Sequence, residues 1–264
     1  MALKLSAEQK SVLKIFGTGM KYLVPNYQRP YSWSVDNCLE LWEDLINSYE
    51  ENSSRSGYFL GNIVLAKSSE TDYFEVVDGQ QRLITLSLFV KALHLYDTDN
   101  NALREILWIP ARRSTESEQQ RLESAVFEDK DNDNFLECLN VNSKDSIDKK
   151  RSKFHQNLDF FCEKIEDKFN KDKDSISKFA DFLLDDVYLL PIQSYDKEQD
   201  RARDDALTIF ETINNRGLDL SDADIFKAQI YMSASGISKQ EDFISQWNAL
   251  VERVQTIGHK VDDA

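Results

Sequence analysis

The sequence predicts an α+β fold with a small mixed β-sheet and a largely helical second lobe. Two apolar segments rich in strand-forming residues, 58–66 and 73–77, flank a polar stretch, a pattern typical of a β-hairpin. A helical apolar period then predicts a helix at 80–96. A third strand is predicted at 187–195, after a long acidic stretch with helical patterning. We therefore expect strand and helical regions to alternate along the chain.

The N-terminal quarter predicts two helices around an extended segment. Residues 6–14 have the pattern of a short helix. Residues 24–33 are expected to be extended, because Pro25 and Pro30 disfavour helix and restrict the residues before them. Asp36 is expected to cap a helix that continues to Glu50.

The next predictions concern the helix at 80–96 and the chain that follows it. Leu83, Leu86, Val90 and Leu93 predict one apolar stripe on the helix at 80–96. Residues 97–150 are polar and acidic, typical of a loop-rich, solvated insertion, and Pro191 suggests that the strand at 187–195 lies at an edge or carries a bulge. Further helices are expected at about 150–170, 175–186, 201–213 and 239–257.

We accordingly divide the chain into three parts. Residues 1–96 are expected to form the core, residues 97–186 an acidic helical insertion, and residues 187–264 a return strand and C-terminal helices that complete the same domain as the first part.

The composition restricts the class of protein. The 264 residues are 41% hydrophobic and 30% charged, which is typical of a globular protein, and no apolar segment is long enough to span a bilayer. The three scattered cysteines and the absence of a secretory signal favour a cytoplasmic protein. The net charge of −15 argues against a stand-alone DNA-binding protein, because DNA affinity depends on basic residues. The sequence has no Walker-type loop and no metal-nuclease cluster.

The first candidate site is the strand–turn–helix segment 73–82. The first amides of a helix lack internal partners and attract phosphate. Gly79 permits close approach, Gln80 and Gln81 offer amides, Arg82 offers a bidentate guanidinium, and Asp78 offers a carboxylate for water or Mg²⁺. The alternative is a purely structural capping box, with Asp78 as the N-cap and Gln81 as its partner.

The second candidate is the aromatic segment 25–33, in which two prolines hold the chain extended. Its aromatic side chains suit stacking on a base or sugar while Arg29 contacts a phosphate. The alternative places Tyr31 and Trp33 in the core.

The third candidate is segment 210–227, a helix end, a turn and a new capped helix. Asn214, Arg216 and Lys227 are expected at the mouth of the phosphate site, and the alternative is capping chemistry alone.

Together these motifs resemble the N-terminal domain of GmrSD-type modification-dependent restriction enzymes, known as domain of unknown function 262. The matching segments are Pro-x-Tyr-Gln-Arg-x-Tyr-x-Trp within 24–33, Tyr-Phe-Leu-Gly-Asn-Ile-Val at 58–64, Asp-Gly-Gln-Gln-Arg-Leu-x-Thr-Leu within 77–86, and Phe-x-x-x-Asn-x-Arg-Gly-x-x-Leu-x-x-x-Asp-x-x-Lys at 210–227. The resemblance covers about 24–230 in the family's order. It implies a ParB/sulfiredoxin-like core that binds nucleoside triphosphate, with GTP preferred, together with Mg²⁺.

The resemblance also implies roles for individual residues. The expected catalytic residues are Asp78, Gln81 and Arg82. The expected nucleotide-binding residues are Tyr27, Gln28, Arg29, Gly79, Gln80, Gln81, Arg82, Thr85, Asn214, Arg216 and Lys227. Residues expected to sense a DNA modification are Tyr27, Arg29, Tyr31 and Trp33.

Three hypotheses for function follow. The first is a nucleotide-binding regulatory domain that hydrolyses NTP within a phage-defence restriction system acting on modified DNA. The second is a non-enzymatic sensor of modified DNA, and the third a platform that binds a partner chain. In each, DNA cleavage is expected from an HNH-type nuclease domain or subunit outside this chain, and no membrane partner is expected.

Overall fold

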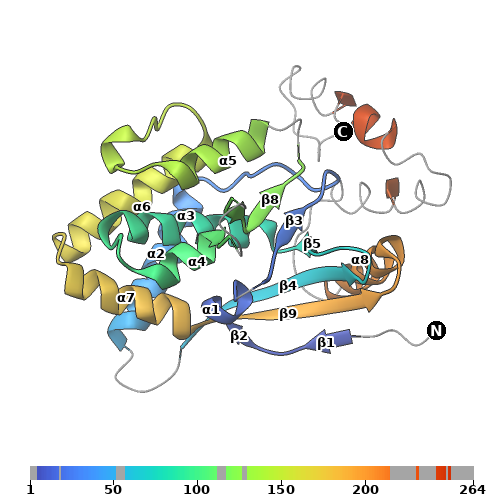
Figure 1. Ribbon diagram of the computed structural model, residues 1–264, viewed down its shortest axis with the longest axis horizontal. Coiled ribbons are helices and arrows are strands. Elements are labelled where there is room, and N and C mark those ends of the chain that lie inside the picture. The colour runs from blue at the N-terminus through green and yellow to red at the C-terminus, as the bar shows by residue number, and fades with distance from the viewer. Residues whose placement is uncertain are drawn as a thin grey trace.

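A mixed β-sheet of seven strands organises the part of the chain that the structure describes (Figure 1). Its order is β1 (Leu5–Ala7), β9 (Val187–Asp196), β4 (Tyr58–Ser68), β5 (Phe74–Asp78), β3 (Tyr22–Val24) and β8 (Leu122–Ser124), and β2 (Lys10–Ser11) also pairs with β9. Strand β4 is parallel to β9 and antiparallel to β5. The computed structural model describes residues 5–17, 19–51, 57–111, 117–126, 130–214, 230–231, 242–247 and 249–250.

The helices fall on the two faces of this sheet. Most of them form one lobe: α1 (Val12–Ile15), α2 (Val35–Glu51), α3 (Gln80–Tyr96), α4 (Asn101–Leu107), α5 (Lys130–Asn140), the short 3₁₀ turn Lys144–Ser146, α6 (Lys153–Phe169) and α7 (Lys173–Asp185). Helix α8 (Gln199–Asn214) packs on β4, β5 and β9. The small strands β6 (Trp108–Ile109) and β7 (Gln119–Gln120) pair with each other. The predicted α+β class with a helical lobe is confirmed, while the ParB/sulfiredoxin likeness stays a prediction.

Alternate side chains of the central strand β4 supply two separate hydrophobic clusters. Ile63 and Leu65 join the large cluster that contains α3, whereas Val64 and Ala66 pack with Ala206 and its neighbours on α8. Because successive strand residues face opposite sides of a sheet, one strand binds both layers together. The functional corner described below lies where this sheet meets α3 and α8.

The predicted helix at 6–14 is wrong. Residues 5–7 and 10–11 are strands, and only Val12–Ile15 is helical. Both strands pair antiparallel with β9, with Leu5 opposite Ser194 and Lys10 opposite Leu189. A partner almost 190 residues away decides this structure, and a local pattern does not reveal it. Helix α2 also begins one residue before Asp36, which therefore lies in its first turn instead of capping it.

Strand β9 confirms the predicted strand but not its edge position. It pairs with β4 on one side and with β1 and β2 on the other. Residues 188–189 of β9 pair with β2, and residues 192–194 of β9 pair with β1. Pro191 lies between these two paired segments. Its missing N–H therefore coincides with an interruption in the ladder, which explains how an interior strand tolerates proline.

Helix α3 occupies the predicted residues but is buried on all sides. Buried residues run without a break from Leu83 to Leu93, because neighbouring helices cover the faces that the sheet leaves open. The predicted single stripe is therefore wrong. A helix that is apolar nearly all round lies inside its domain, and α3 forms the centre of the helical lobe.

Residues 97–150 are more ordered than the expected solvated loop. Strand β8 joins the main sheet parallel to β3, and α5 begins at Lys130, inside the run expected to be an acidic loop. The buried guanidinium of Arg121 donates to the carbonyls of Glu105, Gly17, Met20 and Trp108, at 2.7 to 3.2 Å. These bonds tie the segment to the N-terminal region.

Two further expectations concern the whole chain. No helix among the described residues is long and apolar enough to cross a bilayer. Cys38, Cys138 and Cys162 are all buried thiols, and burial raises the pKa of each to about 12.

Candidate functional site

The turn between β5 and α3 depends on Gly79. This residue is the N-cap of α3 and adopts a left-handed backbone conformation with φ of +92°. A Cβ atom at this position would lie 2.4 Å from Cγ2 of Ile63. Glycine is therefore required both by the backbone angle and by the close approach of β4.

Within the described part of the chain, no side chain caps the first turn of α3. The first intrahelical bond runs from the amide of Leu83 to the carbonyl of Gly79, and the N-cap residue is a glycine, which makes no side-chain cap bond. The carboxylate of Asp78 accepts from the amide of Gly79 itself. The structural alternative, with Asp78 as N-cap and Gln81 as capping partner, is therefore wrong. The amides of Gln80, Gln81 and Arg82 are left at the positive end of the helix dipole.

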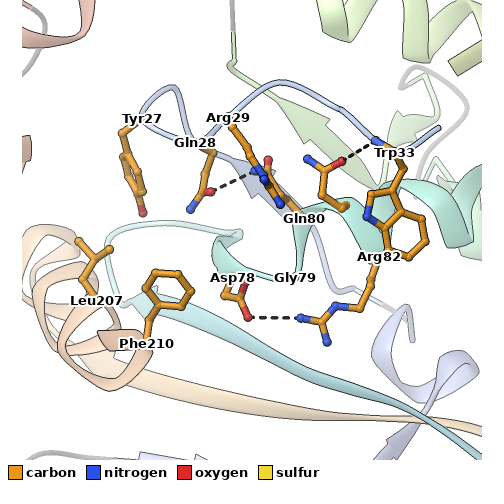
Figure 2. A pocket seen from close by; sticks show the side chains of 11 residues that line it. Tyr27, Gln28, Arg29, Trp33, Asp78, Gly79, Gln80, Arg82, Leu207 and Phe210 are labelled. Atoms are coloured by element: carbon orange, nitrogen blue, oxygen red, sulfur yellow. Dashed lines mark hydrogen bonds and ion pairs between the residues drawn. The ribbon is translucent and has the colours of Figure 1, made fainter. Parts of the chain in front are cut away.

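A cavity of about 150 Å³ lies at this helix start (Figure 2). Three parts of the chain line it: the loop before α2, the β5–α3 corner, and one face of α8. The lining residues are Tyr27, Gln28, Arg29, Trp33, Asp78, Gly79, Gln80, Gln81, Arg82, Leu207 and Phe210. The structure thus brings most of the first two predicted motifs to one place.

Asp78 and Arg82 form the charged floor of the cavity. Their carboxylate and guanidinium are joined by an ion pair of 3.3 Å, and each side chain keeps about a quarter to a third of its surface exposed, 30% and 24% respectively. Burial raises the pKa of Asp78 above its ordinary value, against the opposing effects of Arg82, the Gly79 amide and Arg29. The guanidinium of Arg82 also packs against Gly61, where an added Cβ would lie 2.5 Å from Nη1.

Gln81 ties α3 to the aromatic segment. Its side-chain oxygen accepts from the amides of Ser32 at 2.8 Å and Trp33 at 3.3 Å, and its nitrogen donates to the carbonyl of Pro30 at 3.1 Å. The side chain is buried. Since both ends of the amide are engaged with the protein, this geometry suits positioning of the segment.

Gln28 and Gln80 make a second connection across the same interface. Gln28 donates to the carbonyl of Val77 at 2.6 Å, and Gln80 donates to the oxygen of Gln28 at 3.1 Å. The oxygen of the buried Gln80 side chain has no hydrogen-bond partner among the described residues. A buried acceptor without a hydrogen bond is costly and rare in native proteins, which sets this oxygen apart from the other polar atoms of the corner.

The aromatic residues of segment 25–33 have different surroundings. Tyr31 is buried, shares a hydrogen bond of 2.8 Å with Thr85 and stacks on Phe154, so neither Tyr31 nor Thr85 lines the cavity. Trp33 is half-buried at its wall. Tyr27 lines the cavity as well, but its hydroxyl donates to Glu75 at 2.8 Å.

The third predicted motif lies mostly outside the described residues. Helix α8 ends at Asn214, whose side chain is outside them, as are Arg216 and Lys227. Their placement at the mouth of the cavity therefore stays a prediction.

Sequence reasoning missed the apolar wall. Leu207 and Phe210 of α8 line the cavity opposite the aromatic segment. Their spacing of three residues puts them on one helix face, which was a visible signal. That this face meets the cavity depends on the packing of α8 against β4 and β5, which no local pattern shows.

The comparison with known protein families gives a match over most of the chain. Residues 12–231 match the family described as GmrSD restriction endonuclease, N-terminal domain. The match spans the helical lobe, every strand of the main sheet except β1 and β2, and every described residue that lines the cavity. No curated protein matches the sequence. Because the family match covers well over half of the chain, this protein belongs to the GmrSD restriction endonuclease N-terminal domain family.

Proposed function

We propose that this chain is the nucleotide-binding regulatory domain of a restriction system directed at modified DNA, and that the cavity at the start of α3 holds the phosphates of a nucleoside triphosphate. Membership of the GmrSD family supports a role in restriction. The observation that carries the nucleotide assignment is the first turn of α3, which no described side chain caps and which opens on a cavity lined by Arg29 and Arg82. Free amides at a helix start together with guanidinium groups suit a phosphate.

The carboxylate of Asp78 determines how the phosphate binds in this proposal. A phosphate beside an ionised Asp78 meets electrostatic repulsion, which a divalent cation between them would remove. Mg²⁺ commonly uses one carboxylate together with phosphate oxygens. The described residues contain no group of three or more His, Cys, Asp or Glu side chains suited to a metal. This is compatible with a Mg²⁺ ion that arrives with the nucleotide and uses Asp78 alone.

The size of the cavity limits which part of the nucleotide it holds. Its volume of about 150 Å³ is below the range of roughly 300–1,000 Å³ typical of sites that enclose whole small molecules. We propose that it receives the phosphates, with the nucleoside reaching beyond the described lining. GTP is the preferred nucleotide in this proposal, following the family resemblance.

Hydrolysis makes further demands on the site. It requires a positioned water and stabilisation of charge in the transition state. Asp78 would orient the water or the Mg²⁺ ion, and Arg82, once released from Asp78 by the incoming phosphate, would stabilise the charge. Gln81 would act by holding the aromatic segment. DNA cleavage belongs to a separate nuclease domain or subunit in this scheme.

Calorimetric titration of the chain with Mg·GTP, Mg·ATP and Mg·tripolyphosphate tests the proposal. We expect binding of all three, and weaker binding by the Arg82→Met variant. Arg104→Met is the matched control, because Arg104 makes a surface ion pair with Glu118 and does not line the cavity. Equal affinity in wild type and Arg82→Met, or no heat with any of the three, would refute it. Released phosphate, measured in parallel, decides hydrolysis.

The apolar wall favours a second candidate, a sensor of modified DNA. Trp33 and Phe210 flank the charged floor, an arrangement suited to a backbone phosphate with an attached base or modifying group. Tyr31 is buried on Phe154, so the sensor would rely on Arg29 and Trp33. Titration with modified and unmodified oligonucleotides of equal length separates the candidates. Selective binding of the modified oligonucleotide without nucleotide turnover would favour the sensor.

A further inference from the structure

A buried ion pair stands next to the cavity and takes no part in lining it. Glu75 of β5 is 1% exposed and Arg203 of α8 is 13% exposed. Both nitrogens of the guanidinium fork contact the carboxylate: Nε bonds Oε1, and Nη2 bonds Oε2 at 2.7 Å. A bidentate pair of this kind fixes the relative position of its two elements more strongly than a point contact does. It joins α8 to the strand that leads into Gly79.

Two more donors complete the shell of the Glu75 carboxylate. Gln199 donates to Oε2 at 3.0 Å, and the hydroxyl of Tyr27 donates to Oε1 at 2.8 Å. Burial, followed by the adjacent Glu75, raises the pKa of Tyr27 well above its ordinary value, so the phenol keeps its proton and remains a donor. The carboxylate therefore holds three separate parts of the chain: β5, α8 and the segment that contains Tyr27.

The ring of Tyr27 also contacts Tyr231 and Arg203. The Tyr231 ring lies 4.5 Å from it, centroid to centroid. The guanidinium of Arg203 lies 5.9 Å from the Tyr27 ring and 5.7 Å from the Tyr231 ring. Both tyrosines are buried in the cluster on the α8 side of the sheet. Ring contacts and cation–π contacts of this kind stabilise a defined geometry.

Tyr27 belongs to a short segment that forms one wall of the cavity. We call residues 25–30 the pocket loop. The amide of Gln28 bonds the carbonyl of Pro25 in a tight turn, and prolines stand at both ends of the loop. With so little backbone freedom, a displacement of Tyr27 moves Gln28 and Arg29, which line the cavity.

We propose that Arg203 and Tyr231 are positioning residues for the pocket loop, and that they couple occupancy of the cavity to the packing of residues 230–231. They act through Tyr27 and do not touch the phosphate. Coupling of this kind is reciprocal: if Tyr231 packing favours the binding-competent loop, a bound ligand favours Tyr231 packing by the same factor. The ligand part of this inference rests on the proposed function, while the coupling of Tyr231 to the loop does not.

Hydrogen exchange on the full chain tests the coupling without any ligand. We compare peptides from the pocket loop with a reference peptide from α6 in wild type, Tyr231→Ala and Tyr231→Phe. We expect faster exchange in the loop of Tyr231→Ala, unchanged exchange in α6, and near wild-type behaviour in Tyr231→Phe, which keeps the ring. Arg203→Lys keeps the positive charge but loses the bidentate contact with Glu75, so the exchange rate in the loop should increase by an intermediate amount.

Ile244→Ala is the matched control for loss of packing. Ile244 belongs to the same cluster but contributes no ring contact to Tyr27. We expect this variant to have a lower melting temperature with little change in loop exchange. Equal exchange in the loop of wild type and Tyr231→Ala, or an equal increase in Ile244→Ala, overturns the proposal.

Calorimetry with Mg·tripolyphosphate provides the second readout. Coupling of ordinary strength predicts about tenfold weaker binding by Tyr231→Ala and wild-type affinity for Tyr231→Phe. Wild-type affinity in Tyr231→Ala would overturn the link to ligand binding. If the wild-type chain binds no probe, the proposed function fails, and the exchange experiment still decides the coupling.

Discussion

Replacement of Arg82 by Met separates the binding role of this residue from its structural role. Arg82 forms an ion pair with Asp78 at 3.3 Å, and a quarter of its side chain is exposed. A pair this exposed contributes up to about 1 kcal/mol to folding stability, and Met retains much of the contact of the side-chain stem with the protein. A hydrogen bond from a charged donor to a bound phosphate contributes roughly 1.5–3 kcal/mol. At about 1.4 kcal/mol for each factor of ten, affinity should fall roughly 10- to 150-fold.

The two quantities are measured on the same preparation. Urea unfolding gives the free energy of unfolding, and calorimetry with Mg·tripolyphosphate gives the affinity. We expect a loss of stability of about 1 kcal/mol or less with a loss of affinity of at least about tenfold. A loss of several kcal/mol in stability with unchanged affinity would show that Arg82 is a structural residue and would refute the reasoning.

Three further predictions follow from the same corner. Asp78→Asn should bind sulfate without Mg²⁺ and independently of pH. In wild type, sulfate affinity should rise as pH falls through the raised pKa of Asp78, because sulfate keeps its charge while the repelling carboxylate becomes neutral; a flat profile contradicts this. Gly79→Ala should lower the free energy of unfolding by roughly 2–5 kcal/mol, because alanine strains the left-handed backbone and its Cβ clashes with Ile63. In a double-mutant cycle, the variant that also carries Ile63→Ala should lose less stability than the sum of the two single losses, because the clash is removed. Gln81→Leu should cost about 1–3 kcal/mol in urea unfolding by leaving the Ser32 amide without its acceptor, and a cost near zero would show that the connection is dispensable.

The parts of the fold that depend on local chemistry were predictable. The hairpin of β4 and β5 follows from two apolar, strand-forming segments, and α3 follows from the turn glycine and the long apolar segment after it. The N-terminal strands were not predictable, because Leu5–Ala7 has structure only through its pairing with β9. The sheet strand at Leu122–Ser124 is too short for its pattern to differ from a loop, and its place is determined by parallel pairing with β3.

The sequence identified the segments that form the candidate site, but it did not show which of their side chains face the cavity and which face the core. The sequence singled out the turn at Gly79 and the segment at 25–33, and the cavity joins them. It left open whether Tyr31 faces the core, because an aromatic side chain in an extended segment has no local signal for its direction. Nor did it show the link from Tyr27 to Glu75 and Arg203, which join residues far apart in the chain.

The backbone amides at the start of α3 provide the most direct test of the anion site. A titration of isotope-labelled chain with Mg·tripolyphosphate, followed by amide chemical shifts, reports on each of them. Binding at this corner predicts that the largest saturable shifts fall on Gly79, Gln80, Gln81 and Arg82, with smaller shifts along the pocket loop. Shifts that cluster elsewhere, or no saturable shift at these four amides, would contradict the assignment of this helix start as a phosphate site.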